Sequence, residues 1–136
     1  MPGAKLGRVA LFGSDYGAGS DLDLFVYSAG ELVGASASGS SNESVDLPAG
    51  TYDVYIVQFA VPAGQSQQTA KLNTFVVGNA AANLTVTPAS QPVATGAMVT
   101  VRVAWSGLTP GKHYLGLVEY GEGATVRGRT VIAVNA

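Results

Sequence analysis

Cysteine is absent from this chain of 136 residues, and only 12% of its residues are charged. The lack of cysteine excludes a disulfide framework and any chemistry that needs a thiolate. Globular chains average about 25% charged residues, so the surface of this protein must consist largely of Ser, Thr, Asn, Gln and Gly. Such a surface is typical of proteins that work outside the cell, and it predicts secretion.

Positive charge is also scarce. Seven Lys and Arg residues stand against nine Asp and Glu residues, the net charge is −2 and the pI is about 5.1. A domain that binds nucleic acid normally carries a basic patch or stripe on its surface. We therefore expect neither DNA nor RNA as a partner.

Long apolar runs are missing as well. No run approaches the roughly 20 residues that cross a bilayer, and residues 1–12 (MPGAKLGRVALF) lack the apolar core of a secretion signal. We therefore expect no membrane partner. If the protein is exported, we expect the signal to lie upstream, in a longer precursor.

The chain does contain regular alternation of apolar and polar residues. No helical pattern of apolar residues is sustained, whereas period-two patterning recurs between clusters of Gly, Ser, Pro and Asn. We predict an all-β protein with essentially no helix, built as a β-sandwich of jelly-roll or immunoglobulin-like type with about ten strands. The expected strands are Leu6–Phe12, Asp21–Tyr27, Glu31–Ala37, Glu43–Leu47, Tyr52–Phe59, Ala70–Val77, Leu84–Thr87, Met98–Trp105, His113–Tyr120 and Thr125–Val134.

The clearest strand is Met98–Trp105 (MVTVRVAW). Successive side chains of a strand point to opposite sides, so Val99, Val101, Val103 and Trp105 share one face. We predict that this face is buried.

A small, uncharged segment, Gly78–Ala82, predicts a domain boundary. The first β-sandwich would cover residues 1–79, and a second, immunoglobulin-like or fibronectin-III-like β segment would cover residues 83–136. With about 55 residues, the second segment is small for an independent core, so we expect it to pack on the first. One continuous unit is the alternative. Within the first part, Gly34–Asn42 predicts a weak edge strand that runs into a flexible loop.

Residue types for catalysis are sparse. His113 is the only histidine, and no Ser lies in a Gly-x-Ser-x-Gly elbow. The segment Gly107–Lys112 lacks the spacing and the following helix of a phosphate-binding loop. One His without Cys cannot supply the usual zinc ligands. We predict that the chain is not an enzyme and that His113 is an exposed turn residue.

Three carboxylates form a candidate metal site: Asp15, Asp21 and Asp23, within GSDYGAGSDLDLFVY. Asp21 and Asp23 alternate with leucines, so both leave the same strand face roughly 6.6 Å apart. A hard cation such as Ca²⁺ would relieve their repulsion, with Asp15 and loop carbonyls as further ligands. The alternative is that Asp21 caps the turn and Asp23 faces water or a cross-strand Lys or Arg.

Aromatic residues could also form a stacking platform for sugars or peptides. Tyr52 and Tyr55 have opposite parity, however, so they cannot share a face of a regular strand. We expect these two residues, with Tyr27, Phe59 and Phe75, to pack in the core or to be half-buried.

The order of several short segments resembles a known family. Gly19–Tyr27, Gly30–Gly34, Glu43–Leu47 and Pro48–Tyr55 are similar to the pre-peptidase C-terminal type of domain. A second set of segments is similar to the tail of secreted, actinobacterial-type subtilisin-like serine proteases. This set is Asn73–Gly78, Asn83–Pro88, Trp105–Gly111 and Tyr114–Gly116.

The resemblance implies a non-catalytic, β-rich appendage that lies C-terminal to a peptidase domain and is exported with it. The catalytic motifs of such peptidases are absent, so only Asp21 and Asp23 transfer, as the family's Asp-Leu-Asp-Leu strand with possible ion binding. The family has further strands before the one that ends near Phe12. This chain lacks them, so the first sandwich is N-terminally truncated relative to the family, and whether it closes without an upstream or intermolecular partner is left open.

The expected function is that of an accessory domain of a secreted subtilisin-like protease, which aids folding and stability or binds substrate or a surface. Its partners would be the parent catalytic domain and a protein or polysaccharide substrate. One alternative is a structural adhesion or assembly domain that self-associates through exposed edge strands. A carboxylate enzyme is disfavoured, because neighbouring acids on one strand point in parallel and do not face each other across a cleft.

Overall fold

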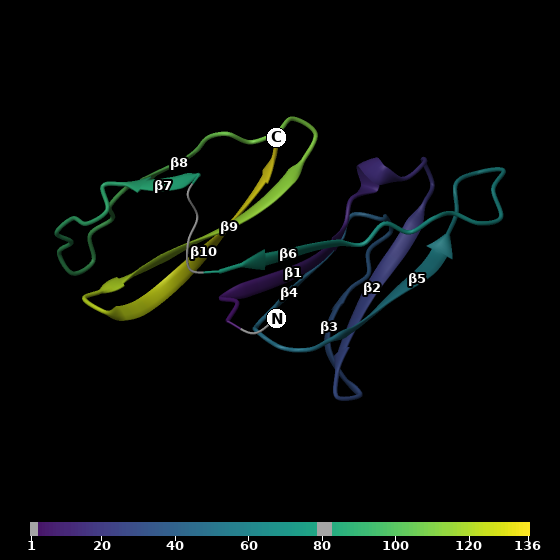
Figure 1. The fold of residues 1–136 in the computed structure, drawn as a ribbon, viewed down its shortest axis with the longest axis horizontal. Coiled ribbons are helices and arrows are strands. Elements are labelled where there is room, and N and C mark those ends of the chain that lie inside the picture. The colour runs from purple at the N-terminus through teal and green to yellow at the C-terminus, as the bar shows by residue number, and fades with distance from the viewer. Residues whose placement is uncertain (1–2, 79–82) are drawn as a thin grey trace. The chain divides into compact units, whose positions relative to one another are not determined.

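The computed structural model describes residues 3–78 and 83–136 and is almost entirely β (Figure 1). Within these residues the only helix is a single 3₁₀ turn, η1 (Gly13–Asp15). All sheets are antiparallel. The described strands are β1 (Leu6–Leu11), β2 (Asp21–Ser28), β3 (Glu31–Ser36), β4 (Glu43–Leu47), β5 (Asp53–Ala60), β6 (Asn73–Val77), β7 (Leu84–Thr87), β8 (Arg102–Trp105), β9 (His113–Glu122) and β10 (Thr125–Asn135). The prediction of an all-β, sandwich-like protein is confirmed.

The chain divides into two compact units, Met1–Gly78 and Asn79–Ala136. Most of the predicted boundary segment, residues 79–82, lies outside the described residues. The expected packing of the second segment on the first stays a prediction. No helix in the described parts of the chain has the length and apolar character that a membrane crossing requires.

The first unit contains two three-stranded sheets, with strand orders β4-β1-β6 and β3-β2-β5. Each side chain of a strand points opposite to the next, so Leu22, Leu24 and Leu47 reach the interior while their neighbours do not. Both sheets contribute to one hydrophobic core. Its buried members are Val9, Leu11, Leu22, Leu24, Val26, Val45 and Leu47, and the half-buried Tyr16, Tyr52, Val54 and Ile56 pack against them.

The two sheets approach each other closely where β3 meets β4. A Cβ atom on Gly34 would lie 2.5 Å from Cγ1 of Val45. Real Cβ atoms do not come so near to a neighbour, so a larger residue would push the sheets apart or displace Val45. Glycine at this position therefore permits the packing of the core.

The second unit consists of two antiparallel pairs, β7 with β8 and β9 with β10. The β9-β10 hairpin is long, and its register shifts between Val126 and Gly128. Beyond the shift Tyr120 pairs with Gly128, and a Cβ atom on Gly128 would clash with Cζ, Cε2 and Oη of the tyrosine. The aromatic ring thus covers the backbone of Gly128, which has no side chain of its own.

The prediction for Met98–Trp105 is wrong in two respects. The strand begins only at Arg102, and Val99, Val101 and Trp105 are exposed. The partner strand β7 has four residues, and the chain after it contains Pro88 and Pro92, which have no N–H to donate to a sheet. Without a partner strand, residues 98–101 neither pair nor bury a face.

Candidate functional site

Asp21 and Asp23 leave β2 on the side opposite to the core leucines, as predicted. Their strand neighbours are Ala60 and Val57 on β5, so neither has a basic residue directly across the ladder. Each carboxylate holds its Oδ1 atom buried and without a hydrogen-bond partner. Burial raises the pKa of Asp23, and the charges of Asp21 and Glu43 raise it further. The two acids are therefore poorly satisfied by the protein itself.

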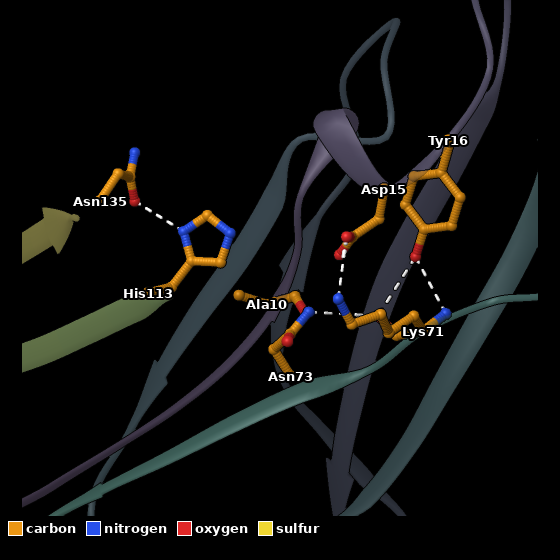
Figure 2. Close-up of polar contacts among 7 residues, drawn as sticks. All are labelled: Ala10, Asp15, Tyr16, Lys71, Asn73, His113 and Asn135. Carbon is orange, nitrogen blue, oxygen red and sulfur yellow. Dashed lines mark hydrogen bonds and ion pairs between the residues drawn. The ribbon is translucent and has the colours of Figure 1, made fainter. Parts of the chain in front are cut away.

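Asp15 has a different partner. Nζ of Lys71 donates to its Oδ1 at 2.8 Å (Figure 2). Oη of Tyr16 donates to the carbonyl oxygen of Lys71 at 3.2 Å and accepts from its backbone N–H at 3.0 Å, which fixes the loop that carries Asp15. Within residues 3–78 and 83–136, no three acidic, His or Cys side chains are grouped so that they could hold a metal ion. Calcium binding at Asp21 and Asp23 stays a prediction.

A buried acid that sequence reasoning missed is Glu43, the first residue of β4, which is only 3% exposed. Its carboxylate accepts hydrogen bonds from the hydroxyls of Ser36 and Ser38 and, at 2.8 Å, from the backbone N–H of Ser38. Burial raises the pKa of Glu43, but these three donors outweigh it and the pKa lies below its usual value. The carboxylate is therefore held in its charged form.

The signal for Glu43 was present in the sequence. In ESVDL the acid has the same parity as Val45 and Leu47, so alternation alone places it on the buried face. The serine-rich segment that follows β3 is not merely a loop, because Ser36 and Ser38 supply the donors that this acid needs.

A second polar cluster lies beside it. Oγ of Ser20 contacts Oγ of Ser41 at 2.7 Å and donates to Oε1 of Gln68 at 2.8 Å. Nε2 of Gln68 donates to the carbonyl oxygen of Ala60 at 3.2 Å. The hydrogen bonds tie the loop before β2, the serine-rich loop and the segment after β5 together at one end of the β3-β2-β5 sheet.

The outward side of the β3-β2-β5 sheet is rich in apolar side chains. Residues paired across a ladder share a face, and Phe25 pairs with Tyr55, Asp23 with Val57, and Tyr27 with Leu32. The rings of Tyr27 and Tyr55 meet edge to face with their centroids 5.4 Å apart. We define the outer apolar face as Phe25, Tyr27, Leu32, Tyr55 and Val57.

This face is open to solvent. Tyr55 is 58% exposed, and Phe59, in the β5 bulge at the end of the face, is 77% exposed. The expectation that the aromatics pack in the core or are half-buried is confirmed for Tyr27, Tyr52 and Phe75 and is wrong for Tyr55 and Phe59. The sequence pattern shows which residues share a face, but it does not show whether anything covers that face.

His113 begins β9 and pairs with Asn135 across the hairpin. Its Nδ1 lies 2.7 Å from Oδ1 of Asn135 (Figure 2). A carboxamide oxygen only accepts hydrogen bonds, so Nδ1 carries the proton. The residue is half-buried and belongs to a strand, in contrast to the expected exposed turn residue.

Comparisons with protein-family models, with curated proteins and with solved structures found no match to this chain. The resemblance to the pre-peptidase C-terminal domain therefore stays a prediction.

Proposed function

We propose that the chain is a non-catalytic accessory module of a secreted protein, and that it binds a partner or substrate through the β3-β2-β5 sheet. In line with the sequence resemblance, the parent would be a subtilisin-like serine protease, and the module would aid its folding and stability or help it to engage substrate. The observation that carries the proposal is the open outer apolar face. Monomeric soluble proteins rarely expose contiguous apolar patches of this kind unless the patch is used for an interaction.

The polar chemistry of the chain agrees with a binding role. Asp23 pairs with Val57 of the outer apolar face, and Glu43 accepts hydrogen bonds from Ser36 and Ser38. Nδ1 of His113, the only histidine of the chain, lies against the carboxamide of Asn135.

The test is incubation of the purified chain with chromogenic peptide substrates and with an insoluble polysaccharide. We expect no hydrolysis above buffer, and no difference between the wild type and His113→Ala. Reproducible hydrolysis that His113→Ala abolishes would contradict the proposal.

A second candidate is assembly through exposed edges, which one observation favours. The edge strand β5 has eight residues, Asp53–Ala60, and contains neither Pro nor Lys, the residues that usually protect an edge from pairing. Sedimentation of the full chain over a range of concentrations separates the two roles. A concentration-dependent dimer that Ile56→Pro abolishes, with the monomer still folded, favours assembly, and a monomer throughout favours the accessory binding module.

A further inference from the structure

We infer that the outer apolar face binds an extended, basic polypeptide segment, with Lys or Arg side chains reaching Asp23 and Asp53 and an apolar side chain lying over Phe25 and Tyr55. The inference deepens the binding role proposed above and rests on it. Three features of the described residues carry it: the open apolar surface, the sign of the charge around it, and the spacing of its acids.

The surface is suited to an apolar side chain. Phe25 and Tyr55 pair directly across the ladder, and Tyr27 meets Tyr55 edge to face. Aromatic rings offer a large contact area, and their faces attract cations as well as apolar groups. The exposed Tyr55 and Val57 line the edge strand β5, where an extended segment can also pair with the open backbone.

The charge around the face has one sign. Strands β2, β3 and β5 carry Asp21, Asp23, Glu31 and Asp53, and their sequences contain no Lys, Arg or His. A second copy that docked by the same face would bring acids against acids. Charge complementarity therefore favours a basic partner over self-association.

The acids also lack donors. Oδ1 of Asp21 and Oδ1 of Asp23 are buried without a hydrogen-bond partner. A Lys side chain brings three donors and an Arg side chain brings five, and charge-assisted bonds to carboxylates are the stronger kind. The buried Oδ1 atoms are out of a partner's reach, but a cationic side chain would offset the charge of these partly exposed carboxylates from the solvent side of the sheet.

The spacing sets the sequence of the partner. Asp23 lies opposite Val57, and Asp53 lies opposite Tyr27, so four residues separate the two acids along the sheet. Four residues of extended chain span roughly 13 Å and return to the same side. A segment with cations at positions i and i+4 and an apolar residue at i+2 therefore places its two cations near Asp23 and Asp53. Its apolar residue then lies over the pair formed by Phe25 and Tyr55.

The experiment titrates the full chain with the synthetic peptide TKTFTKT, using calorimetry and amide chemical shifts, with chelator present. We expect saturable binding, shifts that centre on β2 and β5, and affinity that falls as salt is added. The acidic peptide TETFTET should not bind. Equal binding of both peptides, or shifts confined to residues 83–136, would overturn the inference.

Variants test the two components of the face. Asp23→Asn combined with Asp53→Asn should weaken TKTFTKT binding about fivefold, and Tyr55→Ser about tenfold. The matched controls are Glu122→Gln and Val76→Ser, an acid and an exposed apolar residue on other sheets, and both should bind as the wild type does. Face variants that bind as tightly as these controls would refute the inference.

The outcome is distinguishable from failure of the proposed function. A chain that neither hydrolyses substrates nor binds TKTFTKT would overturn the basic partner and leave the accessory role standing. Self-association that Tyr55→Ser abolishes would instead identify a second copy as the occupant and overturn the inference.

Discussion

At the scale of single residues, the pKa values of two carboxylates, the partly buried Asp23 and the buried Glu43, are shifted in opposite directions. Asp23 has a raised pKa because it is partly buried and lies near Asp21 and Glu43. Glu43 is more buried, yet its pKa is lowered because Ser36 and Ser38 donate to it. Burial alone does not decide the charge of an acid; the donors around it do.

The first prediction concerns Asp23→Asn. A raised folded-state pKa means that the native state binds the proton more tightly, so stability is lost as the pH rises through that pKa. At pH 7 the neutral variant should therefore be more stable, by up to about 0.5 kcal/mol after allowance for solvent screening. The gain should disappear below 3.8, the ordinary pKa of the residue. Urea unfolding at several pH values measures it, and a less stable variant at pH 7 would contradict it.

The second prediction is that Ca²⁺ raises the melting temperature of the wild type, because a cation relieves the repulsion between Asp21 and Asp23. Asp21→Ala combined with Asp23→Ala should remove the response. Asp53→Ala, which removes an acid at the other end of the same sheet, should keep it. A melting curve that is indifferent to calcium and to chelator would end the calcium proposal.

The third prediction concerns Glu43→Gln, which places an amide where three donors need an acceptor. The free energy of unfolding at pH 7 should fall by about 1–3 kcal/mol. Because the folded-state pKa of Glu43 is lowered, its contribution is present above 4.5 and is lost as the pH falls through the folded-state value, so the variant should differ least in acid. The exposed Glu31→Gln is the control and should change stability by less than about 0.5 kcal/mol.

At the scale of strands, alternation predicted most of the fold. The expected Asp21–Tyr27 corresponds to β2, and the pattern placed Leu22 and Leu24 inside correctly. The same pattern misplaced Val99 and Val101, because a strand also needs a partner and, among the residues that the structure describes, β8 pairs only with Leu84–Thr87. Periodicity predicts which residues of a strand share a face, but it does not predict whether a partner strand lies beside them.

The fourth prediction tests the approach of β3 to β4. Gly34→Ala would place a methyl group against Val45, and the rearrangement should cost about 1–3 kcal/mol of stability. Gly39→Ala is the matched control, since a Cβ atom there meets nothing within 4 Å. Thermal or urea unfolding of both variants measures the difference, and equal stability would show that the sheets are free to adjust.

At the scale of the whole molecule, the two units differ in what they bury. Every buried residue of the described chain lies between residues 3 and 78, where two sheets enclose a core. None of residues 83–136 is buried, and Met98 is 98% exposed. The first unit therefore contains the core that folding requires.

The fifth prediction follows from this difference. A fragment of residues 1–78 should unfold cooperatively and give dispersed amide signals, because both sheets that enclose the observed core lie within it. A fragment of residues 83–136 should not fold by itself, because its two pairs of strands bury too little apolar surface. Calorimetry and amide spectra of both fragments measure this. A cooperative transition in the second fragment would show that it has a core of its own.

The sequence by itself determined the all-β class, most strand positions and the parity of each side chain, because local alternation depends only on successive residues pointing to opposite sides. Only the tertiary structure decided that Glu43 would find three donors, that Asp15 would pair with Lys71, and that the outer apolar face would be left open. Each of these depends on how the chain turns back on itself, over a few residues for Glu43 and over more than fifty for Asp15 and Lys71, and a period of two residues contains no information about such partners.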